Sequence, residues 1–179
     1  PSVATMFRED TMAYGVSRGA QVAELSYGNT AFVMTLVLPQ AGTSPRQWLQ
    51  GLDATAFSAA LPTAERKVDL SLPKFRLAVD YQLADALSRM GMGIAFRARE
   101  ANFTRIANAE LFLTHVKQDV FIDVNEEGTE AAAVTQVGVG LVSAPVIPVM
   151  HLDRPFLFFI RERLSGTILF AGIIEQPAS

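Results

Sequence analysis

Three residues could supply the chemistry of a serine hydrolase. Ser17 lies at the centre of a Gly-x-Ser-x-Gly pattern, Gly15–Gly19, and Asp123 and His151 follow in the chain order of the α/β-hydrolases. Such a serine needs a buried strand directly before it and a helix directly after it. The sequence shows no buried strand ending at Gly15, and a strand rather than a helix follows the pattern. We therefore expect no catalytic triad, and a protein that is not an enzyme; His151 is expected to be structural.

The other polar motifs are too incomplete for a cofactor or metal site. Gly138 and Gly140 match part of a dinucleotide-binding fingerprint but open no helix, which that fingerprint requires. The chain has two histidines and no cysteine, which leaves few ligands for a metal ion. Glu126 and Glu127 fit a solvated turn or a hinge better than acid–base catalysis. The sequence therefore predicts no cofactor and no metal.

Length and composition favour one folded domain. Of the 179 residues, 50% are hydrophobic and 18% are charged, which is typical of globular rather than disordered proteins. The net charge of −3 and the lack of a basic run give no reason to expect nucleic acid or an anionic membrane as a partner. No apolar stretch is long enough to span a bilayer, so we expect no membrane span and, within these residues, no signal peptide. The lack of cysteine does not fix the compartment.

Strand patterns outnumber helix patterns, and their order is not that of repeated βαβ units. Strand-like alternation or apolar runs occur at Pro1–Met6 (the end of a strand only), Gln21–Tyr27, Thr30–Leu38, Val68–Leu77, Leu111–Asn125, Phe156–Ile160 and Thr167–Ile174. Helices are predicted at Ser44–Leu52, with Ser44 as N-cap, at Ala54–Leu61, and from Asp80 as N-cap to Gly91. Gly28-Asn29 predicts a hairpin turn, and Pro73 predicts a bend. The fold class is therefore α+β.

Residues 126–143 differ in character from the other strand-like segments. Between Ala131 and Val142 there is no charge, and almost every residue is small or β-branched. In a strand, one face would carry Thr129, Ala131, Ala133, Thr135, Val137, Val139 and Leu141. This face suits a packed core, but the alanines and Gly138 and Gly140 give little intrinsic preference for a strand. Two hypotheses stay open: a hydrophobic strand with a flexible end, or a loop that can insert into a sheet.

Several motifs resemble the serpins, a family of serine protease inhibitors. Residues 125–135 (NEEGTEAAAVT) resemble the hinge that precedes the serpin reactive-centre loop, and residues 150–160 (MHLDRPFLFFI) resemble the family's C-terminal signature. Residues 166–172 are similar to its closing strand, and Leu72–Phe75 and Asn102-Phe103 also match. The resemblance runs through the whole chain, 1–179, and implies the C-terminal half of a serpin fold, with several sheets and surrounding helices. The composition is compatible with a bacterial source.

The resemblance implies a suicide-substrate inhibitor of serine proteases. In that mechanism the protease cleaves the reactive-centre loop, here about residues 126–148, and the cut loop inserts into the main sheet with the acyl-enzyme attached. The strand pair that follows the loop covers about residues 152–176. The implied hinge residues are Glu126, Gly128, Thr129, Glu130, Ala131, Ala132, Ala133 and Thr135.

The family's usual spacing from Thr129 places the reactive bond at Val142–Ser143. A β-branched bait residue implies an elastase-like target, whereas cleavage at Leu141–Val142 would imply a chymotrypsin-like one. Proline after the bond disfavours Ala144–Pro145. The resemblance also implies an extracellular or periplasmic location.

The sequence departs from a complete serpin in two ways. The N-terminal half, with its helices, several sheet strands and the usual breach tryptophan, is not among these residues, and Trp48 lies elsewhere. That missing half is therefore an expected partner, and open sheet edges are expected to favour self-association. Gln118 stands where many animal serpins carry a buried histidine. The alternative function is a non-inhibitory serpin, a carrier or chaperone, or an inactive fragment; the intact small-residue hinge favours the inhibitor.

Overall fold

The computed structural model describes residues 4–27, 29–125 and 146–177. Within the chain, two compact units are distinguished, one formed by Pro1–Phe75 with Val124–Ser179 and the other by Arg76–Asp123. Strands dominate the first unit, and the second combines a pair of strands with short helical turns. The predicted α+β class is confirmed.

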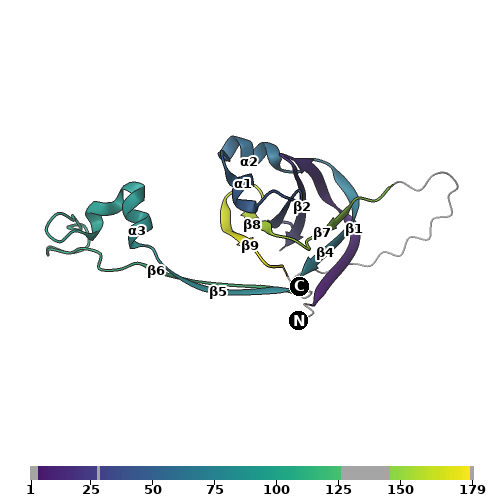
Figure 1. Ribbon diagram of the computed structural model, residues 1–179. Helices are drawn as coiled ribbons and strands as arrows, with labels where there is room; N and C mark the ends of the chain where they lie inside the picture. The colour runs from purple at the N-terminus through teal and green to yellow at the C-terminus, as the bar shows by residue number, and fades with distance from the viewer. Residues whose placement is uncertain (1–3, 28, 126–145, 178–179) are drawn as a thin grey trace. The chain divides into compact units, whose positions relative to one another are not determined.

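The larger unit is built on one seven-stranded sheet (Figure 1). Its strands are β1 (Thr5–Ser17), β2 (Ala20–Tyr27), β3 (Phe32–Pro39), β4 (Glu65–Pro73), β7 (Val149–His151), β8 (Phe156–Glu162) and β9 (Ile168–Ile174). Their order is β7-β4-β1-β2-β3-β8-β9. All neighbouring pairs are antiparallel except β4 and β7, which are parallel.

The first strand is longer than the sequence suggested. We predicted only a strand end within residues 1–6, whereas β1 continues to Ser17. The charged run Arg8–Asp10 hides an alternation that becomes clear only further along, where Met12 and Tyr14 are buried. We predicted that no buried strand ends at Gly15; β1 continues through Gly15 to Ser17, with Val16 71% exposed. Arg18 and Gly19 have φ of 51° and 70°, as in a two-residue hairpin turn that leads into β2.

The hairpin of β2 and β3 and both short helices are confirmed. The register runs from Ala20 opposite Pro39 to Tyr27 opposite Phe32. Helix α1 (Pro45–Leu49) begins at a capping box, in which Ser44 Oγ accepts from the Gln47 amide and Gln47 Oε1 accepts from the Ser44 amide. Helix α2 (Ala54–Ala60) is capped by Asp53.

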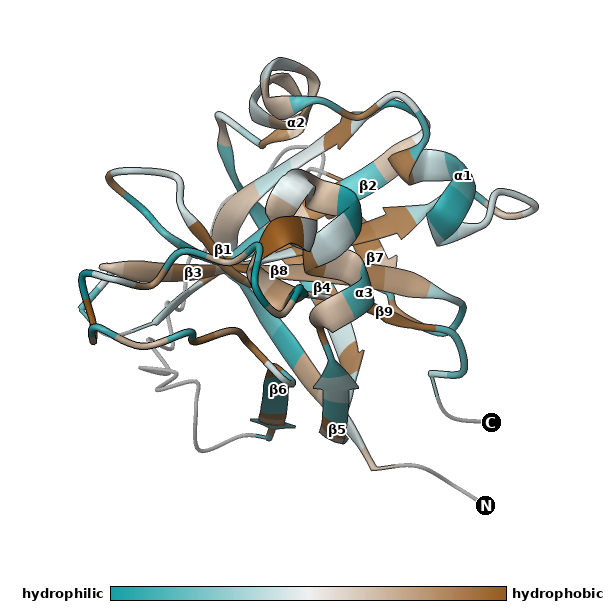
Figure 2. Ribbon diagram, turned by 90° about the vertical axis from the view of Figure 1, so that its left-hand side faces the viewer, coloured by the Kyte–Doolittle hydropathy of each residue, from teal (hydrophilic) through white to brown (hydrophobic). Residues whose placement is uncertain are grey.

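The two helices cover one face of the sheet through a compact hydrophobic core. Trp48 of α1 and Ala60 of α2 are buried there together with side chains of three strands: Ala20, Val22, Val37, Leu157 and Phe159. Trp48 therefore serves as a core residue in this unit. Strands β8 and β9 consist almost entirely of hydrophobic residues, as predicted (Figure 2).

The predicted strand around Pro73 is two strands. Strand β4 ends at Pro73 and β5 (Phe75–Gln82) begins two residues later, so the bend at the proline is confirmed. Strand β5 pairs with β6 (Lys117–Val124) in a two-stranded sheet. The alternation predicted for β6 is confirmed, because Ile122 and Val124 are buried and Phe121 is 63% exposed. The strand is shorter than predicted, because it starts at Lys117 and residues 111–116 are not part of it.

The predicted helix after Asp80 is present but starts later. Asp80 lies within β5, and α3 (Ala84–Leu87) begins after Leu83 without a side-chain cap. A π-turn (Ser88–Met92) and a 3₁₀ turn (Gly93–Phe96) follow. Gly91 has φ of 99°, a left-handed conformation that interrupts the helical backbone where the sequence predicted a stop. Among the helices described, none is long and apolar enough to cross a membrane.

Candidate functional site

The predicted site residues lie outside the described residues. This holds for the reactive bond at Val142–Ser143 and for all the hinge residues between Glu126 and Thr135. What the structure gives is the geometry of the two flanks of this segment. These flanks are β6 with Asn125 on the N-terminal side and residues 146–151 on the C-terminal side.

The N-terminal flank, β6, carries a charged pair close to its end. Both Nε and Nη2 of Arg76 donate to Oδ2 of Asp123, at 3.1 and 2.7 Å. The Arg76 guanidinium also lies 5.8 Å from the centre of the Phe121 ring. The Arg76 side chain is 70% exposed, so this pair contributes at most about 1 kcal/mol. Gln118 lies on the same strand and is exposed.

The C-terminal flank is fastened to the sheet by β7, a strand that sequence analysis missed. Strand β7 runs parallel to β4, with Asp69 opposite Val149 and Ser71 opposite His151. The Asp69 amide donates to Pro148 O and the Leu152 amide donates to Ser71 O, both at 2.9 Å. The exposed amide of Gln21 also donates from Nε2 to Val149 O, at 3.2 Å.

Side-chain burial completes this attachment. Met150 is 0% exposed and Leu152 is 1% exposed, and burying two such side chains contributes about 3–6 kcal/mol in total. Arg154 Nε donates to Pro39 O at 3.0 Å, which fixes the turn before β8. The chain after the candidate loop therefore has a firm anchor, whereas Val146 at its start is 94% exposed.

Strands β8 and β9 are in tight contact. Phe158 lies opposite Gly172, and a Cβ atom on Gly172 would be only 2.4 Å from Cε1 of the Phe158 ring. Glycine is therefore required by packing at this position rather than by backbone conformation.

A buried polar network was also missed. Arg161 of β8 forms an ion pair with Glu24 of β2, and Thr35 of β3 contacts both. The signal in the sequence was a charged residue inside β2, Glu24, and one directly after the apolar run of β8, Arg161.

The Gly-x-Ser-x-Gly pattern does not form a nucleophile elbow. Ser17 is the last residue of β1, and β2 starts at Ala20 after a two-residue turn. The strand before the serine is present, but the helix after it is replaced by a strand. His151 is the last residue of β7, about half-exposed, with Nε2 3.9 Å from Oδ2 of Asp69. Among the residues described, no group of three His, Asp or Glu side chains could hold a metal ion.

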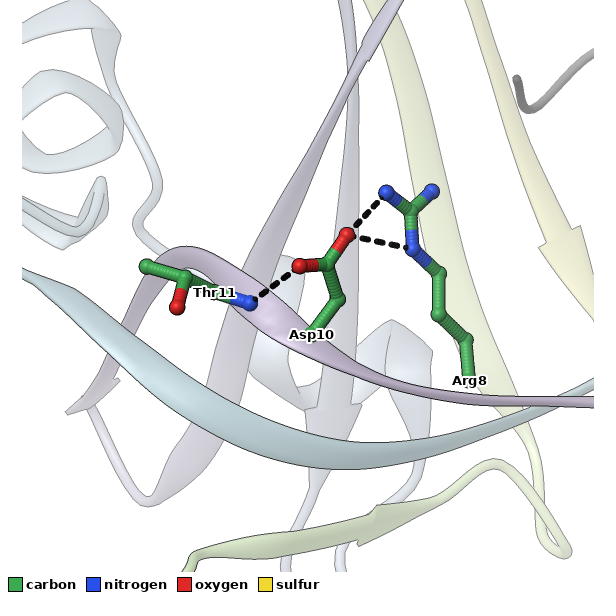
Figure 3. Close-up of polar contacts among 3 residues, drawn as sticks. All are labelled: Arg8, Asp10 and Thr11. Atoms are coloured by element: carbon green, nitrogen blue, oxygen red, sulfur yellow. Dashed lines mark hydrogen bonds and ion pairs between the residues drawn. The ribbon is translucent and has the colours of Figure 1, made fainter. Parts of the chain in front are cut away.

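Two carboxyl groups on the sheet have lowered pKa values. The side-chain hydrogen bond from Arg8 is the main reason that the pKa of Asp10 lies below its ordinary value of 3.8, and the Thr11 amide adds to it (Figure 3). Hydrogen bonds from Ser165 and the Leu164 amide lower the pKa of Glu162 in the β8–β9 turn. Both groups stabilise local structure, and neither is arranged for catalysis.

An open pocket of about 720 Å³ lies between α2 and the β8–β9 end of the sheet. Its lining is partly apolar, from Leu52, Phe57, Phe159 and Ile168, and partly charged, from Asp53, Arg161 and Arg163. Arg161 is already paired with Glu24. Such a lining suits an amphipathic ligand.

Comparisons with known proteins agree with this architecture. The family model described as "Serpin (serine protease inhibitor)" matches residues 1–177. Serpin B10 of Rattus norvegicus is 38% identical over 161 residues, which cover 86% of this chain and 40% of that protein. A serpin-like protein of Methanosarcina acetivorans is 33% identical over 180 residues, 98% of this chain and 42% of that protein.

Solved structures extend the likeness to the fold. Mouse protein-Z dependent protease inhibitor has a TM-score of 0.82 at 24% identity, covering 98% of this chain and 46% of that one. Thyroxine-binding globulin in complex with thyroxine has a TM-score of 0.81 at 25% identity, covering 99% and 47%. The chain thus spans less than half the length of these relatives. It belongs to the serpin family and represents the C-terminal half of the serpin fold.

Proposed function

We propose that this chain supplies the cleaved loop and its anchors in a suicide-substrate inhibitor of serine proteases. The observation that carries the proposal is the contrast between the two sides of the predicted bond. On the C-terminal side, β7 and the buried Met150 and Leu152 hold the chain in the sheet. On the N-terminal side, every second residue of 129–141 is an alanine, threonine, valine or leucine, so this face is uncharged and small at its start.

This contrast matches the needs of the mechanism. After cleavage, the N-terminal piece must leave its place and insert as a strand, while the C-terminal piece stays attached to the body. Main-chain pairing and burial of the small face drive insertion, at roughly 25 cal/mol per Å² of apolar area. The inhibitor acts only if insertion is faster than hydrolysis of the acyl-enzyme. Its role is therefore that of a trapped substrate and not of an enzyme.

The proposed reactive bond is Val142–Ser143, with an elastase-like protease as the target and a chymotrypsin-like one if the bond is Leu141–Val142. Insertion also needs the remaining strands of the main sheet, so a segment equivalent to the N-terminal half of the relatives is part of the proposal. An extracellular or periplasmic site of action is proposed as well, and fractionation of cells that express a tagged chain tests it.

The test uses the natural chain that carries these residues, incubated with an elastase and with a chymotrypsin. We expect a covalent complex that survives SDS denaturation, and mass spectrometry of the denatured products should find a C-terminal fragment beginning at Ser143. Absence of such a complex with every serine protease tried would show that the inhibitory function is wrong.

The pocket beside α2 favours a second candidate, a non-inhibitory carrier, because thyroxine-binding globulin has a similar fold and its structure holds thyroxine. The probe is 8-anilinonaphthalene-1-sulfonate, which is apolar and anionic. Micromolar binding that weakens about tenfold in Arg163→Ala, without any covalent protease complex, would favour the carrier.

A further inference from the structure

A twenty-residue segment of the smaller unit, residues 97–116, contains neither helix nor strand. It lies between the 3₁₀ turn that ends at Phe96 and β6, which begins at Lys117. Irregular segments of this length are uncommon inside a compact unit, and many of those that occur carry a function. Such a segment can enter the active site of a modifying enzyme without the unfolding of a helix or a strand.

This segment contains an acceptor sequence for N-linked glycosylation. Asn102-Phe103-Thr104 matches the pattern Asn-x-Ser/Thr, in which x is any residue except proline. The other three asparagines of the chain do not match, because alanine or glutamate stands two positions after each of them: Asn29, Asn108 and Asn125. A pattern of three residues also occurs by chance, so the geometry around Asn102 has to support it.

The side chains of Asn102 and Thr104 are exposed and joined in one short turn. Asn102 Oδ1 accepts from the Thr104 amide at 3.2 Å and from Thr104 Oγ1 at 2.8 Å. Because the Thr104 amide can only donate, the carboxamide atom that faces it is the oxygen. Nδ2 of Asn102 donates to no residue in the part of the chain that the structure describes. The nitrogen that would carry a glycan is therefore free and faces solvent.

The turn by itself does not explain these two residue types. An aspartate carboxylate at position 102 would accept the same two hydrogen bonds, and asparagine and aspartate both favour such turns. The hydrogen bond from the Thr104 amide would also close the turn without a hydroxyl group at that position. The turn thus accounts for Oδ1 of Asn102, but it leaves both Nδ2 and the Thr104 hydroxyl without a necessary role.

The residue two positions before Asn102 fits an acceptor as well. It is Glu100, and the bacterial form of the acceptor sequence has an acidic residue at this position. The Glu100 carboxylate is paired with Arg97 at 3.0 Å, and both side chains are more than half exposed. An exposed pair of this kind is weak, so the carboxylate stays accessible to an enzyme.

We propose that Asn102 is the acceptor for an N-linked glycan that is transferred from an oligosaccharide bound through a diphosphate to a polyprenyl lipid. Nδ2 of Asn102 loses one proton to a base of the transferase and forms a bond to the anomeric carbon of the first sugar. The bond between this carbon and the phosphate oxygen breaks, and the lipid diphosphate leaves with the electron pair. The inference rests on the proposed extracellular or periplasmic location, because the transfer takes place on the side of the membrane away from the cytoplasm. It does not require the inhibitory mechanism.

The experiment analyses the natural chain that carries these residues, recovered from outside the cytoplasmic membrane of its own cells. Trypsin cleaves after Arg99 and Arg105 and releases residues 100–105 as one peptide. We expect mass spectrometry to find this peptide with a glycan on Asn102. Asn102→Asp and Thr104→Val should each abolish the glycan completely. Asn102→Asp retains an acceptor for the Thr104 amide, so its thermal unfolding should match that of the deglycosylated parent.

The matched control uses Asn108, an exposed asparagine of the same segment that lacks a hydroxyl two positions later. Asn108 should be unmodified in the parent. Glu110→Thr gives it the complete acceptor pattern and should add a second glycan. This variant shows whether the transferase reaches the segment at all.

Three outcomes would overturn the inference. These are an unmodified 100–105 peptide in the exported chain, a glycan on Asn102 that persists in Thr104→Val, and retention of the whole chain inside the cytoplasm. The first is most direct if Asn108 of Glu110→Thr carries a glycan, since the segment is then accessible and Asn102 is passed over.

The covalent-complex assay with a serine protease separates this inference from the inhibitory function. A covalent complex formed by a chain without a glycan leaves inhibition standing and overturns the acceptor site. A glycan on Asn102 without any covalent complex leaves the acceptor site standing, and inhibition is then wrong.

Discussion

The guanidinium of Arg161 lies against the carboxylate of Glu24 in the interior of the larger unit, although 137 residues separate the two in the chain. Both side chains are less than 10% exposed. Thr35 accepts from Arg161 Nε and donates to Glu24 Oε1, at 3.1 Å each. This network joins β2, β3 and β8, and it therefore links the second strand after the candidate loop to the β2–β3 hairpin.

Replacing one member of the Arg161–Glu24 pair should lower the free energy of unfolding more than replacing both. Arg161→Met leaves the Glu24 carboxylate buried without a counter-charge, so the free energy of unfolding should fall by about 3–5 kcal/mol. The double variant Arg161→Met with Glu24→Leu replaces both charges by apolar groups, and it should recover most of that loss. Urea denaturation of the parent, the two single variants and the double variant gives the coupling energy. Additive effects would contradict this account.

Gly172 should tolerate no larger residue. In Gly172→Ala the new methyl group would overlap the Phe158 ring, so the ring or the β8–β9 pairing must shift, and we expect a loss of about 1–3 kcal/mol in the free energy of unfolding. Gly15→Ala is the control, since its Cβ would lie 3.6 Å from the nearest atom, an ordinary contact. Thermal or urea unfolding measures both, and equal losses in the two variants would show that packing on Phe158 is not the cause.

Local signals in the sequence predicted some elements well. Helix α1 was predictable because Ser44, Pro45 and Gln47 form its start within four residues. The β2–β3 hairpin and the β8–β9 pair were predictable because each strand is an apolar run beside a turn. The hinge and the proposed bond also rest on local motifs, and both stay predictions because their residues lie outside the described part of the chain.

Features that depend on distant pairing could not be predicted. Strand β7 has three residues, and only its parallel partner β4, far earlier in the chain, makes it a strand. The length of β1 could not be predicted because its first half is charged. The alternation of buried and exposed side chains there is clear only once its pairing with β4 is known. Asp80 looked like a helix cap, but continuation of β5 to Gln82 keeps it extended.

Asp10 should make stability depend on acid pH. Its pKa in the folded chain is lowered, chiefly by the hydrogen bond from Arg8, so its contribution is fully present above the unfolded value of 3.8 and is lost as pH falls through the lower folded value. The pair is partly exposed, and the contribution should not exceed about 1 kcal/mol. Urea denaturation between pH 2 and 6 should show the parent and Asp10→Asn converging at the acid end.

Arg8→Gln tests the cause of that shift. Because Arg8 supplies the main hydrogen bond, the variant should lose the same pH-dependent part of the stability as Asp10→Asn, and the double variant should lose no more than either alone. If the free energy of unfolding of Arg8→Gln still falls as steeply with acid pH as that of the parent, another group lowers the pKa of Asp10.

The alternation of hinge side chains between the two faces of an inserted strand gives the sharpest test of loop insertion. If residues 129–141 become a strand packed on a core, Thr129, Ala131 and Ala133 must enter that core, while Glu130 and Ala132 remain on the outer face. Thr129→Arg or Ala131→Arg should therefore slow insertion, because a guanidinium would have to be buried. Hydrolysis of the acyl-enzyme would then be faster than insertion. We expect the number of inhibitor molecules consumed per protease inactivated to rise severalfold.

Ala132→Arg is the matched control for Ala131→Arg, because it adds the same side chain one position away on the face expected to stay in water. It should leave the inhibitory stoichiometry close to that of the parent, as titration of residual protease activity would measure. Cleavage at the same bond in all three proteins, verified by mass spectrometry, shows that recognition of the loop is intact. Equal stoichiometry for Ala131→Arg and Ala132→Arg would mean that the loop does not insert as a strand with this parity.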